Sequence, residues 1–265
     1  MSVFRFKRFE VANEQSAMKV GTDGVLLGAA ATILPSDRAI LDVGTGTGVI
    51  ALMAAQRLGT PSYPSSDSSQ PWTPDFQILG LDIDGPSARE AAMNFGRSPW
   101  ASHLSSMRIS LADFAKAYPG SRFDLILSNP PYYDSSLQNP DMRRNTARHS
   151  SPADEETLPG GRLSYRGVIE FASMALAPEG RLSLILPASE EVRLLAAGRS
   201  FGLRPFRLLR ISTTSTKAPS RIVAEFMRGE KAGTHAMKEE SLVIQEHGAY
   251  TQAYRDLVRP FYLWA

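Results

Sequence analysis

An asparagine, two prolines and two tyrosines stand together at the end of an apolar run that is typical of a buried strand. The run is FDLIL, residues 123–127, and SNPPYY begins directly after it. Proline cannot donate to a sheet ladder and it stiffens the chain, so the prolines predict a rigid corner at the strand end. The side-chain oxygen of Asn129 and the backbone carbonyl of Pro130 then form two hydrogen-bond acceptors at a fixed angle.

Such a pair of acceptors suits a planar amine that is conjugated to a ring or a carbonyl group. The nitrogen lone pair of this amine is delocalised, so the nitrogen is a poor nucleophile. Acceptors that hold both N–H groups turn the nitrogen toward tetrahedral geometry, and its lone pair can face an electrophilic methyl group. Tyr132 can stack on the planar group. The competing interpretation is an ordinary turn at a strand end.

A glycine-rich turn, DVGTGTGV at residues 42–49, lies upstream. A dinucleotide fingerprint needs glycine where Val49 stands, and no GK[ST] sequence follows, so neither that fingerprint nor a Walker phosphate loop is present. What remains is a tight turn whose backbone lets a ligand approach closely. Asp42 can accept hydrogen bonds from a cationic amino group. A plain strand-to-helix turn is the alternative.

An acidic residue, Asp82, ends a second apolar run. Nucleoside-binding α/β folds place a carboxylate about 20 residues past the glycines to hold the ribose hydroxyls. Asp82 lies 34 positions past Gly48, and the Ser- and Pro-rich segment 60–75 accounts for the excess. Asp82 is therefore the predicted ribose ligand, whereas Asp84 fits better as the start of a helix.

A third run, residues 106–113, ends in an acid that is followed by Phe114. The carboxylate of Asp113 could receive an adenine amino group, and the phenylalanine could pack on the base. A turn acid and a core aromatic are the alternative interpretation for this pair.

The order of the elements indicates the fold class. Strands are predicted at 4–11, 39–43, 76–83, 106–113, 123–129, 180–187, 206–213 and 221–227, and helices at 22–34, 49–58, 86–97, 165–177, 189–200 and 250–258. Alternating strands and helices predict an α/β, Rossmann-like fold with a mostly parallel seven-stranded sheet, an antiparallel edge strand and helices on both faces. Because ligands bind at the carboxyl ends of such strands, the glycine turn, Asp82 and Asn129 should converge.

Composition sets wider bounds. The 265 residues are predicted to form a single domain, 1–265, with a cap segment at 1–38 and a flexible insert at 60–75. A net charge of +2 permits a polyanionic partner but does not demand one, and the absence of cysteine excludes disulfides and thiolate metal sites. No apolar run approaches the ~20 residues that span a bilayer. We expect a soluble, cytoplasmic protein that is a monomer and holds no metal.

These elements resemble those of class I S-adenosylmethionine-dependent amino-methyltransferases, in which Asp/Asn-Pro-Pro-Tyr/Phe/Trp marks methylation of an exocyclic adenine nitrogen or a glutamine amide. A closer resemblance, to the bacterial tRNA1(Val) adenine-37 N6-methyltransferase family, covers nearly the whole chain. It rests on FRFKRFEVANEQSAMKVGTDGVLLGAAA near the start, NPPYY, RRNTARH at 143–149 and YTQAYRDLVRPFYLWA at the end. The insert at 60–75 departs from the family pattern.

The resemblance implies methyl transfer from S-adenosylmethionine to N6 of adenine 37 in a valine tRNA. It places the target amine at Asn129, Pro130, Pro131 and Tyr132. The implied cofactor-binding residues are Lys19, Thr22, Asp42, Gly44, Thr45, Gly46, Gly48, Asp82, Ile83, Asp113, Phe114 and Asn129.

An RNA partner agrees with the residues themselves. An anticodon-loop base must be splayed from its neighbours before its edge can be read, and stacking and phosphate contacts offset that cost. The candidate RNA-binding residues are Tyr133, Arg143, Arg144, Arg148, Lys217 and Arg221. A solvated basic surface is the alternative for each arginine.

Other functions stay open at this point. Protein-glutamine N5-methylation of release factors uses the same NPPY chemistry, but those enzymes carry a helical N-terminal domain, and only about 38 residues precede the first core strand. DNA adenine methylation would call for a target-recognition domain that is not visible. An RNA-binding protein without catalysis is a further alternative, and Asn129→Ala would leave its behaviour unchanged.

Overall fold

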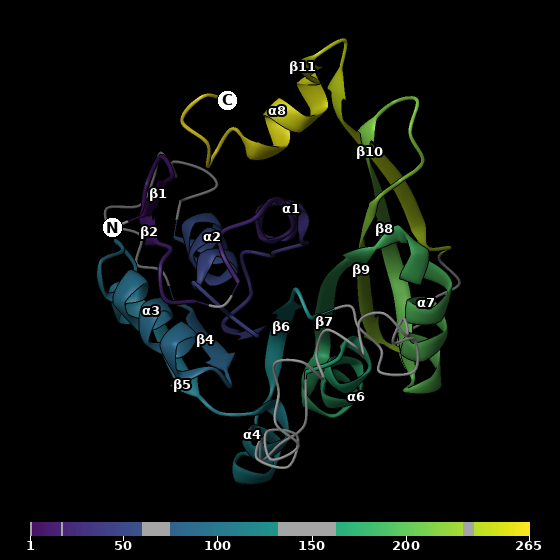
Figure 1. Ribbon diagram of the computed structural model, residues 1–265. Coiled ribbons are helices and arrows are strands. Elements are labelled where there is room, and N and C mark those ends of the chain that lie inside the picture. The colour runs from purple at the N-terminus through teal and green to yellow at the C-terminus, as the bar shows by residue number, and fades with distance from the viewer. Residues whose placement is uncertain (1, 17, 60–74, 132–162, 230–235) are drawn as a thin grey trace, which may run out of the picture.

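A computed structural model describes residues 2–16, 18–59, 75–131, 163–229 and 236–265. The described residues contain one large sheet with the strand order β11-β10-β8-β9-β7-β6-β3-β4-β5 (Figure 1). Its strands are β3 (Ala39–Val43), β4 (Gln77–Asp82), β5 (Leu104–Arg108), β6 (Phe123–Ser128), β7 (Leu176–Pro187), β8 (Leu203–Thr214), β9 (Arg221–Arg228), β10 (Lys238–Glu246) and β11 (Ala249–Tyr250).

The sheet is mostly parallel, which confirms the predicted fold class. Strands β5, β4, β3, β6 and β7 run parallel to one another, β8 and β10 form a further parallel pair, and β9 and β11 run antiparallel to the strands that they pair with. The expected count of seven strands is exceeded, because β10 pairs in parallel with the outer side of β8 and β11 follows it. The long antiparallel strand, β9, is not at the edge but lies between β7 and β8, so its backbone is paired on both sides.

Helices cover both faces of this sheet (Figure 1). One face carries α1 (Thr22–Ala30), α2 (Val49–Leu58), α3 (Gly85–Gly96) and α8 (Gln252–Val258), and the other carries α4 (Leu111–Ala117), α6 (Tyr165–Ala175) and α7 (Glu191–Ser200). Helix α2 is apolar nearly all round its circumference, as expected for a helix buried on all sides. Each face has its own apolar core.

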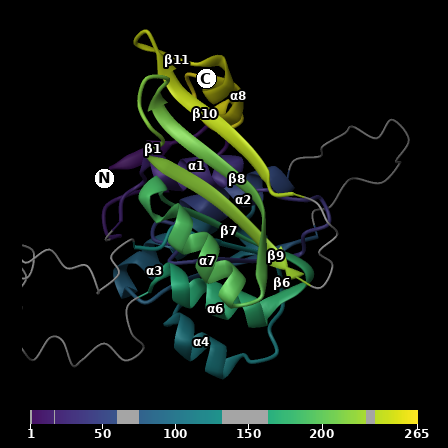
Figure 2. The ribbon, with the colours of Figure 1, turned by 90° about the vertical axis from the view of Figure 1, so that its right-hand side faces the viewer.

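The two ends of the chain are joined on the α1–α2–α3 face. The segment predicted as one strand at 4–11 is a hairpin of two short strands, β1 (Val3–Arg5) and β2 (Glu10–Ala12). At its turn the Lys7 Nζ donates to the carbonyls of Arg259 and Ala265, at 2.6 and 2.9 Å. Figure 2 shows the last strands, β10 and β11, with α8 beside them at the outer end of the sheet.

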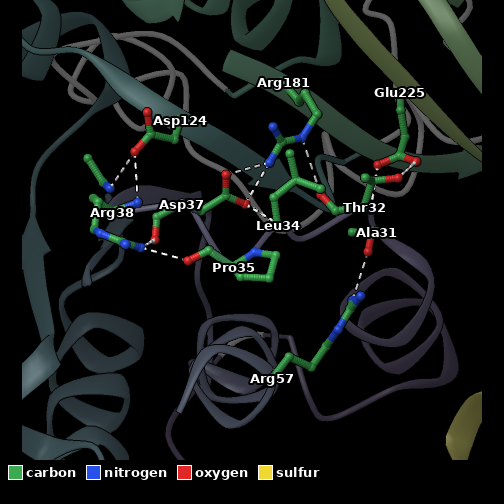
Figure 3. A network of polar contacts seen from close by, with 11 residues as sticks. Ala31, Thr32, Leu34, Pro35, Asp37, Arg38, Arg57, Asp124, Arg181 and Glu225 are labelled. Atoms are coloured by element: carbon green, nitrogen blue, oxygen red, sulfur yellow. Dashed lines mark hydrogen bonds and ion pairs between the residues drawn. The ribbon is translucent and has the colours of Figure 1, made fainter. Parts of the chain in front are cut away.

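A buried polar network fastens the connection between α1 and β3 to the middle of the sheet (Figure 3). The Arg181 guanidinium of β7 donates to both carboxylate oxygens of Asp37 at 2.6 Å, and both side chains are less than 8% exposed. Glu225 of β9, which is fully buried, accepts hydrogen bonds from the N–H and hydroxyl groups of Thr32 at 2.7 and 2.8 Å. Arg57 of α2 donates to the carbonyl of Ala31.

The predicted strand at 106–113 is wrong in its second half. Strand β5 ends at Arg108 and α4 begins at Leu111. Ser110 is the N-cap of that helix: its hydroxyl oxygen accepts from the Asp113 N–H at 3.0 Å, and its O–H donates to the Asp113 carboxylate at 2.7 Å. A serine with an acid three residues later stabilises a helix start, and this local signal outweighs the apolar run.

Candidate active site

Three strand ends converge, as predicted. In the sheet, Val43 at the end of β3 lies between Leu81 of β4 and Ser128 of β6. The buried Ser128 hydroxyl also donates to the Val43 carbonyl at 2.7 Å. Since Gly44 and Asn129 are the next residues of these two strands, the glycine turn and the NPP corner are held side by side.

The glycine turn has a backbone conformation that residues other than glycine rarely adopt. Gly44, Gly46 and Gly48 have φ angles of +72°, +56° and +82°. At Gly48 a Cβ atom would also lie 2.4 Å from the Phe95 ring of α3, so this glycine lets α3 pack against the turn. At Gly46 a Cβ would meet the Ser16 hydroxyl at 3.4 Å and the backbone of Met18, beside the pocket.

Two pockets meet at Gly44, which lines both. One, of about 370 Å³, is polar at its rim and lies between the glycine turn and the segment before α1; its lining includes Met18, Lys19, Thr22, Asp23, Thr45, Gly46, Asn129 and Arg221. The other, of about 330 Å³, is mainly apolar; its lining includes Leu81, Asp82, Ile83, Ile109, Ser110, Leu111, Ala112 and Phe171. Together they form a site across the carboxyl ends of β3, β4 and β6.

Asp82 lines the apolar pocket and is hydrogen-bonded to the glycine turn that lines the polar one. One carboxylate oxygen accepts from the Gly46 N–H and the other from the Asp84 N–H, each at 2.9 Å. Burial raises the pKa of Asp82, and these backbone N–H groups act against the rise. The carboxylate thus stabilises the glycine turn and also faces the apolar pocket, where it can accept hydrogen bonds from ribose hydroxyls.

Asp42 lies beneath the turn, away from both pockets. Its side chain is fully buried, and one carboxylate oxygen accepts from the Thr45 hydroxyl at 2.7 Å. The other oxygen has no hydrogen-bond partner among the described residues. Burial raises the pKa of Asp42 to about 7. Asp42 lines neither pocket, and its hydrogen bond to Thr45 supports the glycine turn.

Asp113 and Phe114 lie on α4 next to the apolar pocket, whose lining stops at Ala112 and resumes at Ala115. The Asp113 carboxylate accepts a hydrogen bond from the Ser110 hydroxyl. The Phe114 ring is buried among other aromatic rings, and its centroid lies 6.1 Å from that of Phe171. Neither residue lines either pocket.

Asn129 is half-buried and its side chain faces the polar pocket. Its Nδ2 donates to the sulfur of Met18 at 3.7 Å. Pro130 is buried and Pro131 exposed, so the first proline anchors the corner in the core.

Of the N-terminal residues, Lys19 and Thr22, which were predicted as cofactor-binding residues, line the polar pocket. Sequence reasoning missed Met18 and Asp23 in the same lining, although both are neighbours of those residues in the chain. It assigned Arg221 to an RNA surface, and the structure places the residue on the wall of this pocket. Lys217 is exposed between β8 and β9.

Several predicted residues fall outside the part of the chain that the structure describes. They are Tyr132, Tyr133, Arg143, Arg144 and Arg148, together with residues 60–74 of the insert.

Sequence comparison decides the family. No family model matches the chain. A Porphyromonas gingivalis protein named tRNA1(Val) (adenine(37)-N6)-methyltransferase is 38% identical over 268 residues, which cover 98% of this chain and 94% of that protein. Proteins of the same name from Flavobacterium johnsoniae and Photobacterium profundum are each 35% identical, covering 98% of this chain and 99% and 98% of those proteins. The chain belongs to the tRNA1(Val) (adenine(37)-N6)-methyltransferase family.

Solved structures agree on the fold of this methyltransferase. A predicted O-methyltransferase from Agrobacterium tumefaciens matches with a TM-score of 0.60 and 18% identity, covering 90% of this chain and 96% of that one. A methyltransferase from Pyrococcus furiosus matches with a TM-score of 0.53 and 17% identity, covering 83% and 89%. At this identity the likeness shows the methyltransferase fold alone.

The site of this methyltransferase fits S-adenosylmethionine, which is the cofactor. The glycine turn lines the polar pocket with the backbone of Gly44 and Gly46, and Asp82 offers carboxylate oxygens in the lining of the apolar pocket. The apolar pocket suits a purine ring, and the part of the polar pocket beside the glycine turn suits a charged amino-acid group. Among the described residues no group of three or more His, Cys, Asp or Glu side chains could hold a metal ion. None of the helices in the part of the chain that the structure describes is long and apolar enough to cross a membrane.

Proposed function

We propose that this protein transfers the methyl group of S-adenosylmethionine to N6 of adenine 37 in tRNA1(Val). The observation that carries the proposal is the position of Asn129: it directly follows β6 and lines the same pocket as the glycine turn. The relatives' name supplies the tRNA and the acceptor atom.

The chemistry needs an activated amine and an electrophile. S-adenosylmethionine supplies an electrophilic methyl group. The side-chain oxygen of Asn129 and the carbonyl of Pro130 accept hydrogen bonds from the two N–H groups of N6, so that the lone pair leaves conjugation with the ring. The nitrogen gains one bond to the methyl carbon as the methyl–sulfur bond breaks and its electron pair stays on sulfur, which leaves S-adenosylhomocysteine. The nitrogen then loses one proton to solvent, so no strong base is required.

The protein's contribution is alignment. Ser128 ties the end of β6 to the end of β3 through its hydrogen bond to Val43, and this contact fixes Asn129 relative to the glycine turn. Asp82 holds the turn from the other side through the Gly46 N–H. A misplacement of about 1 Å in such a site costs on the order of 100-fold in rate, so these supporting contacts matter as much as the acceptors.

Methyl transfer from labelled S-adenosylmethionine to unmodified total tRNA tests the proposal, with release factor as a parallel acceptor. N6-methyladenosine should be the labelled nucleoside in hydrolysed tRNA. Labelled release factor with unlabelled tRNA would instead assign the NPP corner to a glutamine amide. Binding of tRNA without any transfer would reduce the protein to an RNA-binding role.

A further inference from the structure

An ion pair forms one wall of the polar pocket. Arg221 opens β9 and Asp23 lies in the first turn of α1, and the arginine Nε is 2.9 Å from a carboxylate oxygen of Asp23. The two side chains, one-third and about one-fifth exposed, line the same pocket as Asn129. The pair therefore joins α1 to β9, and β7 separates β9 from β6 in the sheet.

The sheet register places Arg221 beyond the strand end that carries Asn129. Ser128 is level with Leu184 of β7, which pairs with Ala224 of β9. Arg221 lies three residues further toward the carboxyl edge, opposite Pro187. The arginine therefore lies further toward the carboxyl edge of the sheet than the end of β6, on the wall of the pocket that contains Asn129. We call this edge the pocket mouth.

At least two contacts on different atoms fix the guanidinium. Its Nε donates to Asp23, and its Nη1 donates to the backbone carbonyl of Ser220 at 3.0 Å. A planar guanidinium held in this way has a fixed orientation, and the guanidinium is a group that proteins use to bind phosphate. The lining also contains Lys19, so two cations and one carboxylate give this pocket a positive balance.

A second arginine, Arg210, also forms ion pairs with carboxylates but lines neither pocket. Arg210 of β8 contacts Glu191 at 2.6 Å and Glu239 at 2.7 Å, on the α7 side of the sheet and away from both pockets. It has the same chemistry as Arg221 without a pocket beside it. Arg210 therefore offers a matched control for the effect of losing an ion-paired arginine.

We propose that Asp23 is a positioning residue for the RNA: it holds Arg221 at the pocket mouth so that the guanidinium binds a phosphate of the nucleotide whose base reaches Asn129. The inference rests on the proposed function. It assigns Asp23 a role that acts through Arg221, and it assigns both residues to RNA binding although they line the same pocket as the glycine turn.

The test compares Arg221→Gln, Asp23→Asn and the double variant, with Arg210→Gln as control, in steady-state methylation of tRNA and in titrations with S-adenosylmethionine. Arg221→Gln should raise the KM for tRNA about tenfold, since a charge-assisted hydrogen bond is lost. The slope of log KM against log salt should fall by about 1, as for one phosphate contact. Asp23→Asn should move the KM in the same direction by less, and the double variant should be no worse than Arg221→Gln.

Cofactor affinity and Tm separate this role from others. The Kd for S-adenosylmethionine should stay within about twofold of wild type in all variants, and Arg210→Gln should leave the KM for tRNA unchanged. Additive effects in the double variant, a weakened cofactor Kd with a normal KM for tRNA, or a change in Tm alone would each overturn the inference. Arg221→Lys keeps the charge but loses the fork, and should recover part of the KM if folding is intact.

The two proposals can fail separately. If wild-type protein does not methylate tRNA, the proposed function fails first. If wild-type protein methylates adenine 37 and Arg221→Gln matches it in KM and salt slope, only the role of the Asp23–Arg221 pair is wrong.

Discussion

Three side chains of this site hold the backbone of the strand ends and of the glycine turn in place. Ser128 hydrogen-bonds to Val43, Asp82 accepts from the Gly46 N–H, and Asp42 supports Thr45 from below. Asp42 precedes the glycines, so the sequence alone could not separate a ligand-facing carboxylate from a buried one. Its full burial and a pKa raised to about 7 mark it as a supporting group.

At this scale, Asp82→Asn should weaken S-adenosylmethionine binding by about tenfold or more, because hydrogen bonds to a charged group are lost. The amide would also turn an NH₂ group toward one of two backbone N–H donors, at Gly46 or Asp84. Titration calorimetry with S-adenosylmethionine measures the effect.

Asp84→Asn is the control for that variant. Asp84 is the N-cap of α3 and accepts from the Ser87 N–H at 2.9 Å, a role that asparagine performs equally well. An equal loss of cofactor affinity in both variants would contradict the assignment of Asp82 as the ribose ligand.

At the scale of elements, the sequence predicted the parts that depend on local patterns. Residues 49–58 form a helix with the predicted bounds, and the runs before the glycine turn, Asp82 and Asn129 are strands. The pattern failed at 106–113, where the Ser110 cap begins a helix inside an apolar run. It also missed that β10 extends the sheet, since the pairing partner of a strand is not encoded in its own residues.

The packing of α3 on the glycine turn gives a prediction about elements. Gly48→Ala should destabilise the protein by about 1–3 kcal/mol, because its φ of +82° is strained for alanine and the new Cβ would meet Phe95 at 2.4 Å. Denaturant unfolding measures the loss.

Gly96→Ala is its control, at the last residue of α3, where nothing lies within 4 Å of an added Cβ. Alanine favours helix by up to about 1 kcal/mol over glycine, so this variant should be neutral or slightly stabilising. Equal destabilisation by both variants would show that Phe95 does not pack on the turn as described.

At the scale of the whole molecule, distant residues form the pairs that hold the site. Arg181 and Asp37 are 144 positions apart, and Arg221 and Asp23 are 198 apart. No local pattern identifies such partners, so sequence analysis could place Arg221 only among candidate RNA-binding residues. The structure adds that it belongs to the wall of the pocket that contains Asn129.

The buried network predicts a large stability effect. Arg181→Met should cost about 3–5 kcal/mol of unfolding free energy, because it leaves the Asp37 carboxylate charged and buried without its cation. Arg5→Met breaks a pair with Glu10 whose side chains are more than half exposed, and should cost less than about 1 kcal/mol. Urea unfolding of both variants checks the contrast, and a small loss in Arg181→Met would mean that the network does not anchor β3.

The central claim is that Asn129 activates the N6 amine of adenine 37. The most direct measurement is single-turnover methylation of a tRNA1(Val) transcript by wild-type protein and Asn129→Ala, with the modified position mapped and the S-adenosylmethionine Kd measured for both. The account predicts N6-methyladenosine at position 37 with wild type, a rate lower by about 100-fold or more in Asn129→Ala, and an almost unchanged cofactor Kd. Methylation of adenine 37 by Asn129→Ala at the wild-type rate would contradict it.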